Sequence, residues 1–379
     1  MQALLFPGEK RAPPVTPVLT ATSRFRWRSV SGAFVVLLAL VPAALVSGWY
    51  QGGAATFVLA ALAIVPLAHW MGVSTEAIAQ RAGAGLGGLL NATFGNAAEL
   101  IIALLALKAG ETAVVKASIT GSVICNLLLV LGMAVFAGGL RRERQVFNAT
   151  AVLSGVALMY LAATGLVIPN LFHLALGPAA EPLMRRLSLA VSVVLLLLYG
   201  LSLLFSLKTH ARLFEGEDDG DGDVEPHWST AQAVGVLAAA TLGTVAVAEV
   251  LVRALEPATH AWGLTPTFVG VVVIAVVANA AEHSSAVLMA IRDRAEVAFS
   301  ICLESSKQIA LLIAPVLVLV SGPLGHPLTL EFSQLEVLAM GISVGATTII
   351  ALDGESNWLE GAMLLGVYAL LAIVFFFVP

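Results

Sequence analysis

Charged residues are scarce in this chain. They make up 11% of its 379 residues, whereas a soluble globular domain carries about 25%. Hydrophobic residues account for 59% of the sequence. This composition excludes an ordinary soluble domain and predicts an all-α polytopic membrane protein. The few charges form no basic stripe, so we expect no nucleic acid partner.

Cysteine is equally rare, because the sequence holds only Cys125 and Cys302. Both fall in apolar segments, which favours buried small side chains over a disulfide or a metal site. On its apolar segments the sequence also lacks the paired aspartates, the Ser/His dyad and the His-Glu-x-x-His motif of an intramembrane hydrolase. We therefore expect neither an enzyme nor a bound cofactor.

Long apolar runs dominate the sequence instead. A membrane span needs about 20 apolar residues. By this measure the sequence predicts eleven transmembrane helices, at residues 30–49, 54–71, 86–109, 112–138, 147–169, 185–207, 230–254, 265–290, 295–321, 333–351 and 358–378. A basic segment precedes the first run, but it is long and no clean cleavage site follows. We therefore interpret 30–49 as a span rather than a signal peptide.

The placement of positive charge predicts the orientation. With the N-terminus in the cytoplasm, most Lys and Arg residues fall in cytoplasmic segments, as the positive-inside rule requires. We expect an integral, multi-pass protein of the plasma (inner) membrane, with the lipid bilayer as its surroundings and a cytoplasmic N-terminus.

An acidic run at residues 215–223 divides the chain. We expect a cytoplasmic segment and first span at 1–53, a five-helix repeat at 54–208, an acidic cytoplasmic linker at 209–229, and a second five-helix repeat at 230–379. The odd number of spans per repeat makes the second enter the membrane from the opposite side, as in many secondary transporters. The linker is either a solvated connection, which we favour, or a weak regulatory cation site.

Two motifs nearly repeat one another across the halves. Residues 95–99 read Gly-Asn-Ala-Ala-Glu, and residues 278–283 read Ala-Asn-Ala-Ala-Glu-His. A carboxylate inside the bilayer costs several kcal/mol by most estimates, so it rarely lies there without a function. Glu99 and Glu282, at matching places in an inverted repeat, predict one shared cation site near the middle of the bilayer.

The residues around these acids indicate a hard cation. Asn96 and Glu99 share a helix face, as do Asn279 and Glu282, because each pair is three residues apart. Oxygen ligands of this kind suit Ca²⁺. His283 is a candidate proton carrier, or else a core histidine. Four further polar residues could complete the site or simply pack helices together. They are Ser122, Asn126, Ser305 and Gln308.

Charge then predicts exchange. Two empty carboxylates in a low dielectric repel one another, so they must be neutralised before the site can cross its barrier. A divalent cation can do this, and so can protons, but not both on the same oxygens. The simplest count from two acids is one Ca²⁺ against about two protons.

In these motifs the chain resembles cation/proton exchangers of the CAX type, within the calcium/cation antiporter superfamily. The resemblance rests on residues 87–100, 121–132, 279–283, 308–311 and 356–361. It implies ten core helices plus one N-terminal span, and export of cytosolic Ca²⁺ driven by inward proton flow. It also implies that Glu99 and Glu282 are essential ligands. Members of the family can form trimers, so the resemblance also allows a homo-oligomer such as a trimer.

The chain differs from the family pattern at Ala278, Glu304 and Lys307. Glu304 and Lys307 are three residues apart and could pair on one helix face. Alternatively, Glu304 could bind a proton and the Lys307 ammonium could compete with Ca²⁺ near Glu282. Two other functions therefore stay open, which are exchange coupled to Na⁺ or K⁺, and a membrane cation sensor that transports nothing.

Overall fold

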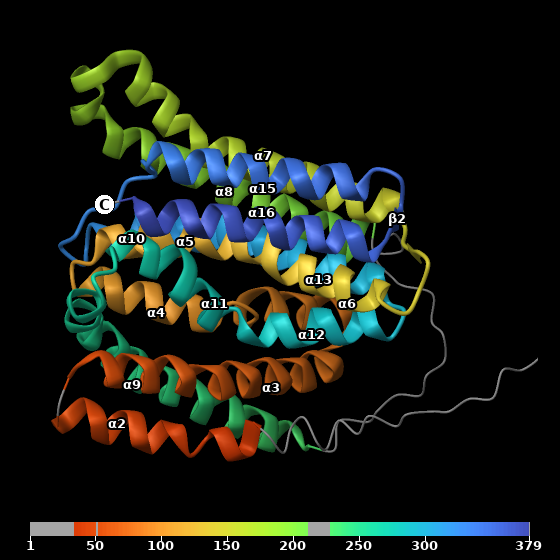
Figure 1. Cartoon of the computed structure of the whole chain (residues 1–379), viewed down its shortest axis with the longest axis horizontal. Coiled ribbons are helices and arrows are strands. Elements are labelled where there is room, and N and C mark those ends of the chain that lie inside the picture. Colours follow the sequence, from red (N-terminus) through yellow and green to blue (C-terminus); the bar gives the residue numbers. More distant parts are fainter. Residues whose placement is uncertain (1–33, 51, 211–227, 379) are drawn as a thin grey trace, which may run out of the picture.

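The computed structural model describes residues 34–50, 52–210 and 228–378. Most of these residues are helical, and the helices run roughly along one common direction (Figure 1). This agrees with the all-α fold that the sequence predicts. The N-terminal segment before residue 34 and most of the acidic linker lie outside the described residues.

The helices fall on both sides of the linker. The first part contains α2 (Leu40–Tyr50), α3 (Ala54–Phe94), α4 (Ala97–Lys108), α5 (Thr112–Ile124), η1 (Cys125–Val130), α6 (Leu131–Gly139), α7 (Ala149–Leu176), η2 (Gly177–Ala180), α8 (Glu181–Leu204) and η3 (Phe205–Thr209). The second part contains α9 (Thr230–Trp262), α10 (Pro266–Phe268), η5 (Val269–Ile274), α11 (Ala275–Ala278), α12 (Ala280–Ile291), α13 (Ala295–Gln308), η6 (Ile309–Ile313), α14 (Ala314–Ser321), α15 (Gln334–Ala351) and α16 (Trp358–Phe377). The η segments are π-helical, except the 3₁₀ turn η2.

Among the described residues, seven helical segments are long and apolar enough to cross a membrane. They are Ala54–Ala82, Thr112–Gly139, Ala149–Thr209, Thr230–Trp262, Ala295–Ser321, Gln334–Ala351 and Trp358–Phe377. The bent pair Pro266–Ala278 and Glu282–Ile291 raises the number to as many as eight, with an angle of 60° at its break. The chain is therefore an integral, multi-pass membrane protein.

One of these segments, Ala149–Thr209, spans two of the predicted helices. It turns back at Gly177, whose positive φ of 56° few other residues adopt easily. The helices on either side, α7 and α8, pack against each other, and their connection projects beyond the rest of the molecule (Figure 1). This segment is therefore a helical hairpin.

The helix α3 also covers more than one predicted element, because it holds 41 residues. A Cβ atom built on Gly87 would lie 2.3 Å from the Ala79 carbonyl oxygen. In a straight helix, residues eight apart are separated by about 12 Å along the axis. The backbone therefore bends sharply between these residues, and the stretch after Gly87 leads into α4.

Two segments form the centre of the molecule. In the most apolar 18-residue stretch of Thr112–Gly139, 83% is buried inside the molecule. The corresponding share is 72% for Ala295–Ser321 and 22% for the outer helix α16. Gly121 of α5 lets the two halves meet closely, because a Cβ there would lie 2.4 Å from the Val271 Cα. Small residues permit such close crossings in membrane proteins.

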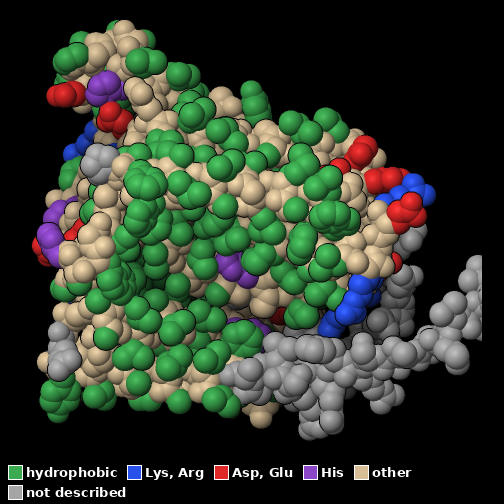
Figure 2. Space-filling view, in the orientation of Figure 1, with side chains coloured by type: hydrophobic (Ala, Val, Ile, Leu, Met, Phe, Trp, Pro, Cys, Tyr) green, Lys and Arg blue, Asp and Glu red, His purple; other side chains and the backbone are tan. Residues whose placement is uncertain are grey.

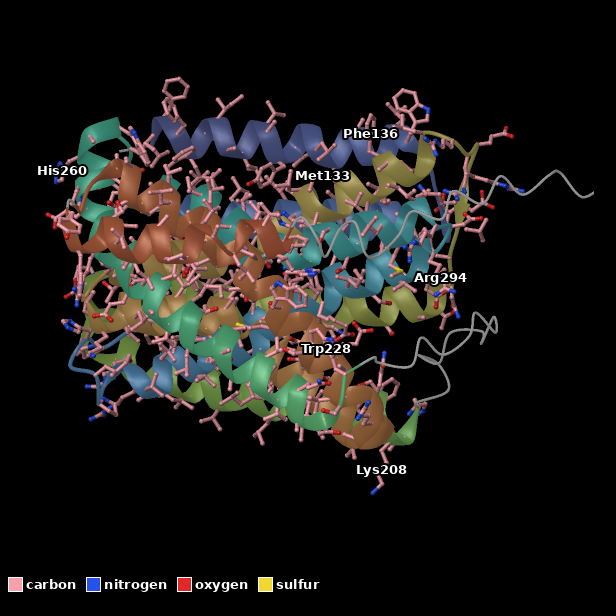
Figure 3. The ribbon with its side chains drawn as sticks, turned by 90° about the horizontal axis from the view of Figure 1, so that it is seen from below. Met133, Phe136, Lys208, Trp228, His260 and Arg294 are labelled. Carbon is pink, nitrogen blue, oxygen red and sulfur yellow. The ribbon has the colours of Figure 1, made fainter. Side chains whose placement is uncertain are left out.

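Charged side chains gather mostly at the two ends of the molecule, whereas the face between them is largely apolar (Figure 2). At one end, β1 (Gln145–Val146) pairs antiparallel with β2 (Glu355–Ser356). Arg142 lies 2.9 Å from Asp293 at this end. Lys208 and Arg294 lie toward the same end, and His260 lies at the other (Figure 3). This distribution is that of a protein whose middle faces lipid.

Candidate cation site

Both repeated motifs coincide with breaks in a helix. Asn96 separates α3 from α4 and has φ −106° and ψ 31°. Asn279 separates α11 from α12 and has φ −87° and ψ 13°. The acids Glu99 and Glu282 lie in the first turns of α4 and α12. Helix N-termini stabilise negative charge, so each break places a carboxylate where the backbone favours it.

Six of the predicted residues form one central hydrogen-bonded chain. Its order is Gln308, Asn96, Ser305, Asn126, Asn279 and Ser122. All six are buried. The chain joins elements from both halves of the sequence, so it links the first half to the second.

The links of this chain are pairwise alike across the two halves. Ser305 donates to Asn96 Oδ1 at 2.9 Å, and Asn279 donates to Ser122 Oγ at 3.0 Å. The asparagine of each half thus contacts the serine of the other half. Asn126 completes the chain by donating to Asn279 Oδ1 at 2.9 Å and to Ser305 Oγ at 2.8 Å.

Both carboxylates carry buried oxygens that have no hydrogen-bond partner among the described residues. Glu99 is 8% exposed, and neither of its carboxylate oxygens has a hydrogen-bond partner within the described part of the structure. Glu282 Oε2 and Asn126 Oδ1 are also buried and have no hydrogen-bond partner among the described residues. The two acids are also close enough to interact electrostatically. Buried polar atoms are normally paired, so these oxygens are free acceptors that a cation or protons would satisfy.

The oxygen atoms of this centre suit a hard cation. Over the described ranges, no three His, Cys, Asp or Glu side chains come close enough together to bind one metal ion. A divalent ion between Glu99 and Glu282 would therefore need the amide, hydroxyl or backbone oxygens nearby. Such oxygen ligands suit Ca²⁺ rather than a soft metal.

His283 follows Glu282 directly, and its Nε2 atom lies 3.4 Å from Cys125 Sγ. Cys125 and Cys302 are both buried and free, as the sequence predicts. The geometry places His283 at the edge of the site and leaves its role as a proton carrier a prediction.

Glu304 and Lys307 are not joined to the central chain. Lys307 is 7% exposed and its ammonium donates to Glu304, three residues earlier on α13. The Lys307 ammonium therefore has a counter-charge on its own helix, other than Glu282.

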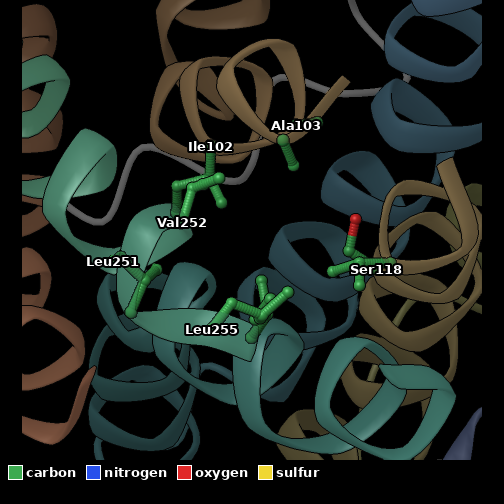
Figure 4. A pocket seen from close by; sticks show the side chains of 9 residues that line it. Ile102, Ala103, Ser118, Leu251, Val252 and Leu255 are labelled. Atoms are coloured by element: carbon green, nitrogen blue, oxygen red, sulfur yellow. The ribbon is translucent and has the colours of Figure 1, made fainter. Parts of the chain in front are cut away.

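A small recess opens beside Glu99. Ser122 and Ser118 line it together with apolar side chains of α4 and η5. A second recess adjoins it, formed by Ile102, Ala103, Ser118, Leu251, Val252 and Leu255 (Figure 4). Each of these two recesses has a volume of about 10 Å³, which is roughly the space of one water molecule, and Glu99 lines the first.

Some polar contacts escaped prediction. Thr120 donates to Glu336 Oε1 at 3.0 Å, and both residues are buried. The sequence does signal Glu336, because Ser333 three residues before it forms a capping box at the start of α15. The π-helical segments have no comparable signal, although η1 contains Asn126 and η6 directly follows Gln308. Such segments are frequent at functional sites.

Known proteins resemble this chain in sequence and fold. The family model described as sodium/calcium exchanger protein matches residues 52–208 and 232–377. A Ca²⁺/H⁺ antiporter of Synechocystis is 44% identical over 365 residues, which covers 92% of this chain and 98% of the relative. The Ca²⁺/H⁺ antiporter ChaA of Bacillus subtilis is 40% identical over 90% of this chain and 98% of its own length.

Solved structures of related exchangers have a similar fold. The structure of native YfkE superimposes with a TM-score of 0.79 at 37% identity, covering 91% of this chain and all of that one. The H⁺/Ca²⁺ exchanger CAX shares the fold, with a TM-score of 0.69 at 13% identity and 92% of both chains covered.

The helical fold and its polar centre are those of a multi-pass membrane transporter. The chain belongs to the sodium/calcium exchanger protein family. Its predicted resemblance to cation/proton exchangers is confirmed by these relatives.

Proposed function

We propose that this protein exports Ca²⁺ from the cytosol in exchange for protons, with Glu99 and Glu282 as shared carboxylates for both ions. The observation that carries the proposal is the set of buried, unpartnered oxygens on Glu99, Glu282 and Asn126. The relatives named Ca²⁺/H⁺ antiporters support the choice of ions, since they match over nine-tenths of this chain.

The exchange follows from what these oxygens can accept. Ca²⁺ between the two acids neutralises both and is held further by oxygens of Asn96, Asn279 and their neighbours. When Ca²⁺ leaves, two like charges remain in a low dielectric, and protons then bind the same oxygens. Ca²⁺ and protons exclude each other from these oxygens. A gradient of one ion therefore drives the movement of the other across the membrane.

Alternating access is proposed to follow from an inverted repeat. Residues 54–208 and 230–379 form the two five-helix units, with 1–53 as an extra N-terminal span and 209–229 as a cytoplasmic linker. The matching helix breaks at Asn96 and Asn279 support this division, as do the crosswise Asn–Ser contacts. Eleven spans with a cytoplasmic N-terminus in the plasma (inner) membrane complete the proposal.

The test is reconstitution into liposomes with an imposed pH gradient and no Na⁺ or K⁺ gradient. Wild-type protein should accumulate Ca²⁺ in response to the gradient. Glu99→Gln and Glu282→Gln should each reduce this uptake at least 100-fold, because either change removes a charge that Ca²⁺ requires. Glu249→Gln is the matched control, since Glu249 is a half-exposed glutamate that pairs with Arg253 on α9.

Each other outcome has a meaning. Uptake that depends on a Na⁺ or K⁺ gradient would replace the proton in the proposal with that ion. Absence of uptake in every condition, together with Ca²⁺ binding, would support the membrane sensor. The contact between Lys307 and Glu304 favours transport, because it gives the ammonium a partner other than Glu282.

A further inference from the structure

Three recesses follow one another from Glu99 to the surface. The first contains Glu99, and the second shares Ile102, Ala103, Ser118 and Ile274 with it. The second shares Leu255 with a third recess at the end of the molecule where His260 lies (Figures 3 and 4). This row of recesses runs between helices of both halves, away from the end that carries Lys208 and Arg294.

The outermost recess is acidic. It is lined by Glu111, before α5, and by Glu256 and His260 on α9. His260 Nε2 lies 4.0 Å from Glu256 Oε1, and both side chains are about four-fifths exposed. Carboxylates in a concave surface raise the local concentration of cations. The inner end of the row is the buried and unpartnered carboxylate of Glu99, which supplies an independent reason for cations to move along it.

The middle of the row is a barrier. Ile102, Leu251 and Leu255 are at most 3% exposed and make its walls apolar. An ion cannot lose its water to such walls, so these side chains separate the mouth from Glu99 in the state that the structure shows. Ser118 is a polar side chain that lines both inner recesses between Glu99 and Leu255.

We propose that these recesses are the path of the ion between Glu99 and the face opposite the linker, with Glu111 and Glu256 forming a divalent-cation-binding mouth. The constriction at Leu251 and Leu255 opens when the site is exposed to that face. The proposal rests on the cation exchange proposed above, and it assigns one side of that exchange to named residues.

The path can be tested without transport. Ser118→Cys should react with a small, membrane-impermeant thiol reagent from the face opposite the linker, and at least tenfold faster than from the linker face. Val115→Cys is the matched control, because it lies one turn earlier on α5 and is fully buried in the core. Leu255→Ala should accelerate labelling at Ser118→Cys by widening the constriction.

Labelling of Ser118→Cys no faster than Val115→Cys would overturn the path, as would faster labelling from the linker face. Since this readout needs no Ca²⁺ flux, a labelled protein that moves no Ca²⁺ would count against the proposed exchange and not against the path.

The mouth is tested by Ca²⁺ uptake at low ionic strength, with Ca²⁺ supplied from one face at a time. The double change Glu111→Gln and Glu256→Gln should raise the half-saturating Ca²⁺ concentration about fivefold from the opposite face only, and salt should shrink the effect. Glu249→Gln, on the same helix as Glu256, should leave the value unchanged. An equal rise from both faces, or none from either, would overturn the mouth.

Discussion

The two helix breaks carry the same residues in different surroundings. Glu99 is buried with both oxygens unpartnered in the described structure, whereas Glu282 is half-buried and has one such oxygen. Asn279 in turn is better bonded than Asn96, because it also donates to the Ala275 backbone at 2.8 Å. The first half therefore supplies more unpartnered oxygens for a cation, through Glu99. The second half supplies more of the hydrogen bonds that hold the centre together, through Asn279.

Asparagine changes should therefore have the largest effect on stability, and an unequal one. Asn279→Ala should lower the free energy of unfolding by about 2–4 kcal/mol, because it removes the hydrogen bonds of Asn279 with Ser122, Asn126 and the Ala275 carbonyl. Asn96→Ala should cost about 1–3 kcal/mol. Unfolding in mixed micelles would measure both, and an Asn96 variant that is less stable than the Asn279 variant would reverse the comparison.

The carboxylates should differ in the opposite direction. Glu99→Leu should raise stability in Ca²⁺-free buffer by about 1–3 kcal/mol, since an apolar side chain replaces a buried and unpaired acid. Glu282→Leu should gain less than about 1 kcal/mol because Glu282 is less buried. Thermal unfolding with and without Ca²⁺ checks this, and Ca²⁺ should stabilise only the wild type. Destabilisation by Glu99→Leu would contradict an unpaired Glu99 carboxylate.

The smallest effects should come from charges outside the site. Glu304→Gln should lower stability by about 1 kcal/mol, because Lys307 keeps its buried charge while Glu304 is half-exposed. Its half-saturating Ca²⁺ concentration should match that of wild type in the uptake assay. A shift of more than threefold would place the pair in the transport site. Glu249→Gln, at an exposed ion pair, should change stability by less than about 0.5 kcal/mol.

Local sequence was enough to find the centre of the molecule. The two Asn-Ala-Ala-Glu segments mark both helix breaks, and Ser122, Asn126, Ser305 and Gln308 of the following helices lie in the central chain. A polar group inside a membrane has few alternatives to a polar partner, which brings these residues together, and their binding of a cation stays a prediction.

Pairing between distant residues could not be predicted in the same way. The contacts of Asn126 with Asn279 and Ser305 depend on how the two halves pack, and no local spacing encodes that. The spacing of Glu304 and Lys307 allowed them to pair, but it did not decide between that pair and competition of the Lys307 ammonium with Ca²⁺. The bend before Gly87 was hidden too, because a run of small residues fits a straight or a bent helix.

The central claim is that Glu99 and Glu282 bind one and the same ion. Calcium binding to purified wild type, Glu99→Gln, Glu282→Gln and the double variant tests it most directly, by calorimetry at fixed pH. If the acids share an ion, each single variant should lose nearly as much binding energy as the double variant, so the effects will not add. Additive losses, or a second equivalent of Ca²⁺ that survives in either single variant, would contradict a shared site.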